Sequence, residues 1–392
     1  MLVDARAAQQ NQAAKRTSYQ TSLEMYSMRR IVSRPTIAVA IALGLAPAAA
    51  FAQGQCKGRP AEHTPACDTT PAKAPFASTG WKTTAVDHFT MEAVDYKKEA
   101  AYYSALMNWK LRSDDGKQAV MDIGDVATVV IRGGYTPPAP APTPVVQAGD
   151  TSAGRGRGRG GPRTPPSAVW DKMAFAITPW DAKKVKAELE KRGLNPVADN
   201  DPSVGFESFV VKDPDGFEVQ VSNGAYAKAR AANKNKAAMS VAGEPFEHTS
   251  WKTVWLDHIS FGVTNYKESV AFYKTLLGWI PTGDEGSQDQ TIICEECGDI
   301  IIRGGNPMNM ARPMPAVRRA SIGHISFGLE GFDYAAVKAE LDKRGLTGRE
   351  DTGTSKKIDD PTAAYKSYHT TTPQGFDLQI SNGTKAARTF RP

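Results

Sequence analysis

The stretch WLDHISFGVTNYKESVAFYKTLLGW, residues 255–279, decides the fold of this chain. It begins with the pattern of a β-strand and continues as an amphipathic helix with apolar residues three to four positions apart. Its one histidine, His258, lies in the predicted strand. From this stretch alone, His258 is either a hydrogen-bonded core residue or the first ligand of a metal site.

The same pattern occurs twice in the chain. WKTTAVDHFTMEAVDYKKEAAYYSALMNW at 81–109 matches WKTVWLDHISFGVTNYKESVAFYKTLLGW at 251–279, and the later segments 129–134, 181–194 and 213–224 match 300–305, 334–346 and 372–383. Self-similarity of this extent indicates repeated structural units. The chain is therefore predicted to contain two homologous domains, residues 80–224 and 250–383.

Each domain divides again into two similar modules. The first module of each reads as strand, helix and strands that end in the motif IRGG, and the second ends in the motif SNG. The helices in the second modules end at Gly193 and Gly345, as is common at a helix C-terminus. In FEVQVSNG the apolar residues alternate with polar ones, which is typical of a strand. The predicted fold class is α+β, with the unit βαβββ used four times.

This arrangement resembles the vicinal oxygen chelate superfamily, which includes glyoxalase I, bleomycin-resistance proteins and extradiol dioxygenases. The resemblance covers nearly all of residues 80–383, and the turn DPDG before the last strand of the first domain is its most specific local motif. It implies that two βαβββ modules form one cupped sheet that holds a divalent metal or a ligand. It identifies the fold better than the reaction, because one fold hosts many chemistries.

The resemblance implies metal ligands on the first and last strands of the modules. In the second domain these positions hold His258, His324 and Gln379, where Gln379 stands in place of the usual glutamate. The expected ion is iron, manganese, zinc or nickel, because imidazole and oxygen donors suit these metals. Asp377 lies about 6–7 Å along the strand from Gln379, so we do not assign it as a ligand.

The first domain serves as an internal control. Its equivalent positions hold His88, Lys172 and Gln220. A protonated lysine repels a cation, so we expect no metal there. Since Gln220 is kept without a metal, Gln379 has two interpretations, as a metal ligand or as a residue that serves the sheet.

Two further residues are candidates for chemistry in the second domain. His369 lies where the extradiol dioxygenases carry a tyrosine, and its ordinary pKa near neutrality suits a general base. Arg303, in the motif IRGG, could bind an anionic substrate, although its repetition as Arg132 is equally compatible with a structural role. An exposed strand histidine is the alternative for His369.

These residues predict a metal-dependent enzyme, either a dioxygenase or a glyoxalase-type lyase or isomerase, with its site in the C-terminal domain. The alternative is a metal-free protein of bleomycin-resistance type that sequesters a small molecule. A third interpretation, a surface protein that uses its arginine-glycine loop, predicts salt-dependent binding to polyanions. We expect a small-molecule substrate as partner, and a homodimer is compatible with the sequence.

The N-terminus predicts export. Residues 1–52 form a signal-peptide region in which a basic start at Met28 precedes the apolar run 36–45 and the small residues before Gln53. The mature protein is expected in the periplasm or outside the cell, and the apolar run is too short to span a bilayer. Four cysteines fit an oxidising compartment. Cys56 with Cys67 and Cys294 with Cys297 are the candidate disulfides.

The remaining segments are connections. Residues 53–79 are Pro-rich, 137–166 are a disordered insertion rich in proline, glycine and arginine, 225–249 are a basic helical linker, and 384–392 are a tail. The composition, 41% hydrophobic and 23% charged, is that of a globular protein. The net charge of +6 comes largely from local basic runs and does not predict a specific nucleic-acid partner.

Overall fold

The structure is a computed structural model, and it describes residues 70–138, 166–284, 289–305 and 317–388. By its contacts the chain divides into two units, residues 1–49 and 50–392, and every described residue belongs to the second. The predicted signal peptide, the Cys56–Cys67 pair and most of the insertion 137–166 lie outside the described residues.

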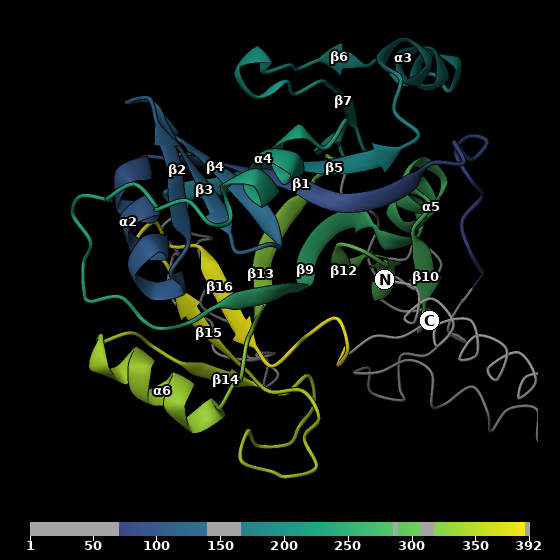
Figure 1. The fold of residues 1–392 in the computed structure, drawn as a ribbon. Coiled ribbons are helices and arrows are strands. Elements are labelled where there is room, and N and C mark those ends of the chain that lie inside the picture. The colour runs from purple at the N-terminus through teal and green to yellow at the C-terminus, as the bar shows by residue number, and fades with distance from the viewer. Residues whose placement is uncertain (1–69, 139–165, 285–288, 306–316, 389–392) are drawn as a thin grey trace, which may run out of the picture. The chain divides into compact units, whose positions relative to one another are not determined.

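The first domain is one eight-stranded sheet with a helix in each module (Figure 1). Its elements in chain order are β1 (Lys82–Ala93), α2 (Tyr96–Met107), β2 (Lys110–Asp114), β3 (Gln118–Ile123), β4 (Ala127–Arg132), β5 (Ala168–Thr178), α3 (Ala182–Lys191), β6 (Val197–Ala198), β7 (Ser208–Lys212) and β8 (Glu218–Ser222). A further helix, α4 (Ala225–Asn233), follows the sheet.

The second domain repeats this plan. Its elements are β9 (Thr253–Asn265), α5 (Tyr266–Leu277), β10 (Ile280–Thr282), β11 (Asp289–Cys294), β12 (Gly298–Gly305), β13 (Ser321–Leu329), α6 (Tyr334–Lys343), β14 (Arg349–Asp351), β15 (Ser367–Thr371) and β16 (Asp377–Ser381). The prediction of four βαβββ modules in an α+β fold is therefore confirmed.

The strand order is the same in both sheets, β2-β3-β4-β1-β5-β8-β7-β6 and β10-β11-β12-β9-β13-β16-β15-β14. The first strand of every module runs parallel to the last strand of that module, and the first strands of paired modules run antiparallel to each other. The four inner strands therefore come from the first and last positions of two modules. This is the arrangement that brings residues of β9, β13 and β16 together.

Capping residues explain where the helices that follow the first strands begin and end. Asp95 and Asn265 cap α2 and α5 by accepting a hydrogen bond from a backbone N–H of the first turn, which satisfies a donor left free at a helix start. The helix α5 ends at Gly278, where φ is +73°. A Cβ at Gly278 would lie 2.6 Å from the carbonyl oxygen of Trp81, so this turn requires glycine.

The two domains share one hydrophobic core. The indole Nε1 of Trp109 donates to Thr253 Oγ1 at 3.0 Å, and that of Trp279 donates to Thr83 Oγ1 at 2.9 Å. Each tryptophan therefore binds the first strand of the other domain. Tyr273 and Trp279 are buried in this core, with their rings stacked.

The linker helix α4 lies on the sheet of the first domain. Its Tyr226 ring packs 4.7 Å from the His88 ring, and Phe206 packs against both. Its Arg230 is buried and donates to backbone carbonyls of the sheet. This helix therefore covers the face of the first sheet on which His88 lies.

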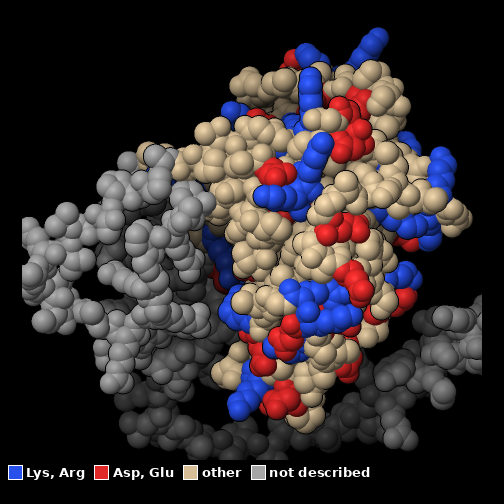
Figure 2. Space-filling view, turned by 90° about the vertical axis from the view of Figure 1, so that its left-hand side faces the viewer, with Lys and Arg blue, Asp and Glu red and all other residues tan. Residues whose placement is uncertain are grey.

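The face of the molecule drawn in Figure 2 shows no dominant charge of one sign. On the face seen in Figure 2, lysines and arginines lie interspersed with aspartates and glutamates. In the described part of the chain, no helix has the length and apolar character needed to cross a membrane.

Candidate metal centre

The aspartate before His258 fixes its ring. His258 lies buried in β9, and its Nδ1 is 2.8 Å from Asp257 Oδ2. Asp257 also accepts hydrogen bonds from the hydroxyls of Ser326 (3.1 Å) and Tyr365 (2.9 Å). A ring that donates its Nδ1–H to the carboxylate can present a lone pair at Nε2 to a metal.

The ring of His324 lies beside that of His258. The two Nε2 atoms are 3.2 Å apart, and the ring centroids are 5.3 Å apart in a T-shaped arrangement. Burial, together with the nearby charges of His258, His369 and Arg303, lowers the pKa of His324 to about 2. His324 is therefore neutral at physiological pH, which is the form that binds metals.

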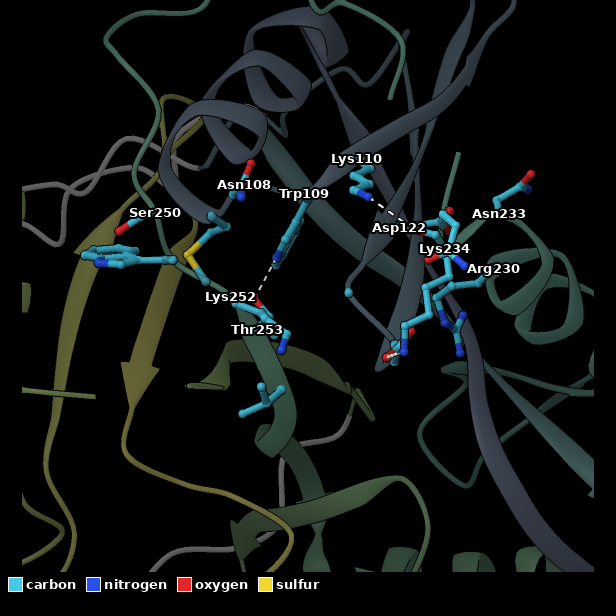
Figure 3. A pocket seen from close by; sticks show the side chains of 16 residues that line it. Asn108, Trp109, Lys110, Asp122, Arg230, Asn233, Lys234, Ser250, Lys252 and Thr253 are labelled. Atoms are coloured by element: carbon cyan, nitrogen blue, oxygen red, sulfur yellow. Dashed lines mark hydrogen bonds and ion pairs between the residues drawn. The ribbon is translucent and has the colours of Figure 1, made fainter. Parts of the chain in front are cut away.

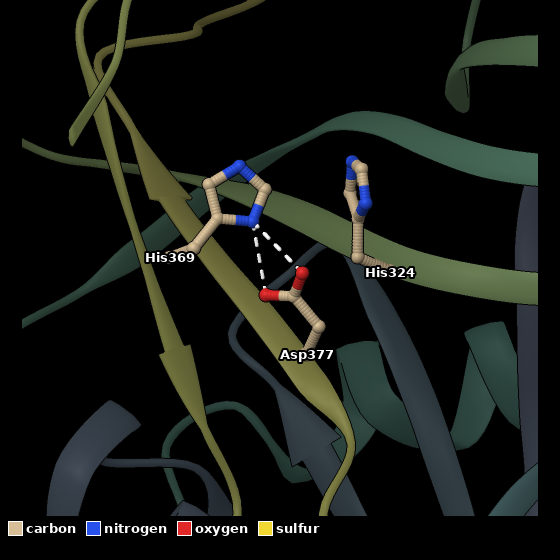
Figure 4. Close-up of side chains that lie close together, drawn as sticks. All are labelled: His324, His369 and Asp377. Carbon is tan, nitrogen blue, oxygen red and sulfur yellow. Dashed lines mark hydrogen bonds and ion pairs between the residues drawn. The ribbon is translucent and has the colours of Figure 1, made fainter. Parts of the chain in front are cut away.

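His369 lies beside His324, and Asp377 binds one of its ring nitrogens (Figure 4), while Asp351 binds the other. Its Nδ1 is 2.9 Å from Asp377 Oδ1 and its Nε2 is 3.2 Å from Asp351 Oδ2. Burial alone would lower the pKa of His369, but the hydrogen bonds with Asp351 and Asp377 outweigh it and raise that pKa. The same contact with His369 lowers the pKa of Asp351 to about 2.

His324, His369 and Asp377 form a cluster of potential ligands. One ligand atom from each lies within 4.8 Å of the others, and this is the only such cluster of three among the described residues. The strand register explains it, because His324 on β13 lies opposite Asp377 on β16, and β15 pairs with β16 beside them. Asp377 was not assigned as a ligand because it lies a strand-step from Gln379. The structure nevertheless places its carboxylate within 4.8 Å of both histidines.

Gln379 is fixed by hydrogen bonds of its amide nitrogen. Nε2 donates to Ser367 Oγ at 2.7 Å and to the Tyr365 hydroxyl at 3.1 Å. Its Oε1 is buried without a hydrogen-bond partner among the described residues, so this oxygen has lone pairs available for a metal or another ligand. In the first domain, however, Gln220 binds Ser208 in the same way and its Oε1 is equally unpaired. The unpaired oxygen is thus not specific to the domain with the histidine pair.

The first domain fills the equivalent space with a lysine. Lys172 is buried, and its Nζ lies 2.8 Å from Asp199 and 3.6 Å from Glu218. Lys172 faces Glu218 across the strands as His324 faces Asp377. An internal ammonium group therefore occupies the position between the two carboxylates.

The other candidates lie around the centre. Arg303 is exposed on β12, and its charge contributes to the lowered pKa of His324. Cys294 and Cys297 form a disulfide at the turn between β11 and β12. Asp299, which no sequence motif marked, lies opposite His258 in the β12–β9 register and is held by Arg388 at 2.6 Å.

The donors fit a divalent metal. Two nitrogen ligands of one ion, each about 2.0–2.1 Å from it, lie roughly 2.8–3.4 Å apart, the shorter distances at octahedral and the longer at tetrahedral angles. The 3.2 Å between the Nε2 atoms of His258 and His324 falls in this range. A direct hydrogen bond between the rings has the same length, so the distance is compatible with both arrangements.

No protein-family model and no curated protein matches the chain. Solved structures do match. A variant of homoprotocatechuate 2,3-dioxygenase from B. fuscum has a TM-score of 0.50 at 14% identity, covering 81% of this chain and 75% of that one. A catechol 2,3-dioxygenase has a TM-score of 0.50 at 11% identity, covering 77% and 89%. An Mn(II)-bound glyoxalase from Novosphingobium aromaticivorans has a TM-score of 0.49 at 16% identity, covering 77% and 82%.

The fold is that of the vicinal oxygen chelate superfamily. At these identities the likeness establishes the fold and leaves the reaction to the residues of the centre. In both sheets the first strands of paired modules are neighbours in the middle of the sheet.

Three residues of the centre were not identified from the sequence, Asp257, Asp351 and Tyr365, and a fourth, Asp377, was considered but not assigned. Asp257 had a signal, because the dipeptide Asp-His recurs at 87–88 and 257–258. Asp351 and Tyr365 lie in short or irregular segments without periodicity. Only the pairing of β14 with β15 places Asp351 beside His369.

Proposed function

We propose that the protein is a divalent-metal-dependent enzyme whose centre lies in the second domain around His324. The observation that carries the proposal is the pair of Nε2 atoms of His258 and His324, 3.2 Å apart, with His258 oriented by Asp257. His324 also belongs to the cluster with His369 and Asp377. It is thus the one side chain common to both candidate ligand sets.

The first ligand set is His258, His324 and Gln379, and the second is His324, His369 and Asp377. In the second set a carboxylate completes two histidines, which is the donor combination of many non-haem iron and manganese sites. In the first set Gln379 supplies a neutral oxygen, so the centre would be more positive. Both sets leave coordination positions open for a substrate.

A metal here would act as a Lewis acid toward a substrate with two neighbouring oxygen atoms. The chain itself would supply orientation and a proton. Asp257 holds the ring of His258, and in the first ligand set, where His369 is not a ligand, the raised pKa of His369 would suit it to act as a general acid. Arg303, exposed on β12, would attract an anionic substrate.

The preferred reaction is ring-cleaving dioxygenation of an aromatic diol, with a glyoxalase-type lyase or isomerase as the second candidate. The two structures of highest TM-score reported above are named as 2,3-dioxygenases, which supports the first choice. After loading with iron or manganese, oxygen uptake with catechol would support the dioxygenase. Conversion of the hemithioacetal of methylglyoxal without oxygen uptake would support the isomerase.

The test is the metal content of the full chain, purified without chelators, by elemental analysis. We expect about one equivalent of iron, manganese, zinc or nickel in the wild type and a loss of at least about tenfold in metal affinity in His324→Ala. His258→Ala and Gln379→Leu test the first ligand set, and His369→Ala and Asp377→Asn test the second. His88→Ala, in the equivalent strand of the first domain, is the matched control and should keep its metal.

A metal-free binding protein is the second candidate function. It is favoured by the first domain, where Lys172 between two carboxylates shows that this space can be filled by an internal cation. His369 between Asp351 and Asp377 could serve the same purpose. Absence of metal from the wild type, even after incubation with each ion, would reject the enzyme and leave this alternative.

We further propose export to the periplasm or the medium, as the signal-like residues 28–52 indicate. Cell fractionation of the full-length protein, with N-terminal sequencing of the mature form, tests this. A protein that retains residues 28–52 in the cytoplasm would contradict it.

A further inference from the structure

A cavity of about 490 Å³ lies between the first domain, the end of α4 and the start of β9 (Figure 3). This volume is within the range of about 300–1,000 Å³ that is usual for small-molecule sites. Trp109 and Trp251 line it, together with four cationic side chains and two carboxylates. The cavity is thus partly aromatic and has an excess of positive charge.

Arg230 is the buried cation of this cavity. It is 5% exposed, and its four hydrogen bonds all go to uncharged oxygens, the carbonyls of Val86, Asp87 and Val126 and the hydroxyl of Thr128. Among the described residues no carboxylate forms an ion pair with it. A buried charge without a direct counter-charge is costly, so this guanidinium favours an anion from outside.

The nearest carboxylates have other partners. Asp122 binds Arg112, whose Nε lies 3.1 Å from it. Asp87 accepts from the Ser222 hydroxyl and from the backbone N–H of Ala227. Burial lowers the pKa of Arg230 although the charges of Asp122 and Asp87 act in the opposite direction, so these two carboxylates do not compensate for its burial.

In the second domain, the corresponding arginine has a counter-charge within the chain. Arg388, which follows the second SNG motif as Arg230 follows the first, donates to the carboxylate of Asp299 at 2.6 Å. Aligning the strands VVIRGG and IIIRGG places Thr128 at the position of Asp299. The first domain therefore lacks the internal counter-charge that the second domain has.

Three exposed lysines surround the opening, and they leave room for an anion. Lys110 donates to the backbone carbonyl of Lys234 at 3.3 Å rather than to a carboxylate. Lys234 pairs with Asp125 and Lys252 pairs with Glu330, both at the surface, where such pairs are weak. All three can approach a bound anion at little cost.

We propose that this cavity binds a small aromatic carboxylate, whose charged group meets Arg230 and the lysines and whose ring lies against Trp109 or Trp251. The site is independent of the metal centre and uses none of its residues. It would hold an anion as a bound ligand, with no chemistry.

The test is calorimetric titration of the full chain with benzoate, with benzamide as its uncharged analogue and inorganic phosphate as an anion without a ring. We expect benzoate to bind one site, with benzamide about tenfold weaker or worse and phosphate weaker than benzoate. Thr128→Asp should introduce the counter-charge of the second domain and weaken benzoate about tenfold. Thr128→Asn, of the same shape without the charge, should not.

Lys252→Gln should weaken benzoate about two- to fivefold, whereas Lys82→Gln, at the equivalent position of the first domain and outside the cavity, should leave the affinity unchanged. Circular dichroism checks that each variant is folded. Failure of benzoate to bind, equal binding of benzamide, tighter binding of phosphate, or identical affinities in Thr128→Asp and Thr128→Asn would overturn the proposal.

Discussion

At the scale of single residues, the aspartate of the dipeptide Asp-His has different hydrogen-bond partners in the two domains. Asp257 accepts from Nδ1 of His258 at 2.8 Å, whereas Asp87 lies 3.6 Å from Nδ1 of His88, which has no hydrogen-bond partner among the described residues. Asp87 instead binds the start of α4 through the amide of Ala227. Only the second domain therefore has an oriented imidazole.

We expect Asp257→Asn to reduce metal affinity about 10- to 100-fold, because the carboxylate that orients a ligand histidine and raises its basicity is lost. Competition with a chromophoric chelator measures this. Asp87→Asn is the matched control, and it should affect stability without changing metal affinity. Equal metal affinities in the two variants would remove Asp257 from the centre.

At the scale of elements, a buried glutamate, Glu99, lies where α2 contacts the second domain. Glu99 is fully buried and accepts a hydrogen bond from Thr372, in the turn between β15 and β16, at 2.6 Å. Burial raises the pKa of Glu99 to about 7, although the hydrogen bonds from Thr372 and the backbone of Gln374 oppose this. The equivalent residue in α5 is Ser269, which carries no charge.

The raised pKa of Glu99 predicts that the free energy of unfolding depends on pH. The folded chain binds the proton of Glu99 more tightly than the unfolded chain, so stability is unaffected below pH about 4.5, falls as the pH rises toward about 7, and is constant above. Glu99→Gln should therefore raise the free energy of unfolding by about 1–3 kcal/mol at pH 8 and leave it unchanged at pH 4. Urea unfolding at both values measures this. The exposed change Glu295→Gln is the control, and a gain independent of pH would contradict the assignment.

At the scale of the whole molecule, the two domains are joined by reciprocal contacts rather than by the linker alone. Trp109 stacks on Tyr103 in its own domain and contacts Phe327 in the other, and Trp279 likewise contacts Tyr273 and Phe175. Each indole N–H is bound by a threonine of the opposite first strand. The domains should therefore unfold together.

We expect Thr253→Val and Thr83→Val each to lower the free energy of unfolding by about 1–3 kcal/mol, because an indole N–H in the shared core loses its acceptor. Urea unfolding followed by tryptophan fluorescence measures the change. The exposed substitution Thr84→Val should have little effect. Two separate transitions in the wild type would show that the domains do not share a core.

The sequence by itself determined the repeated βαβββ modules, because strand and helix periodicity are local and the duplication is visible in the residues. It also pointed to His258, His324 and His369, which the structure brings to one centre. It marked the first domain as different through Lys172, whose ammonium group indeed occupies the space between two carboxylates.

Only the tertiary structure decided which carboxylates meet these histidines. Asp351 reaches His369 through the pairing of β14 with β15, and Asp377 reaches it diagonally across β15 and β16. The same holds for Arg230 on Thr128 and Arg388 on Asp299, since each arginine follows its sheet in the chain and folds back onto it. Register and chain reversal depend on contacts between residues far apart in sequence, and periodicity carries no information about them.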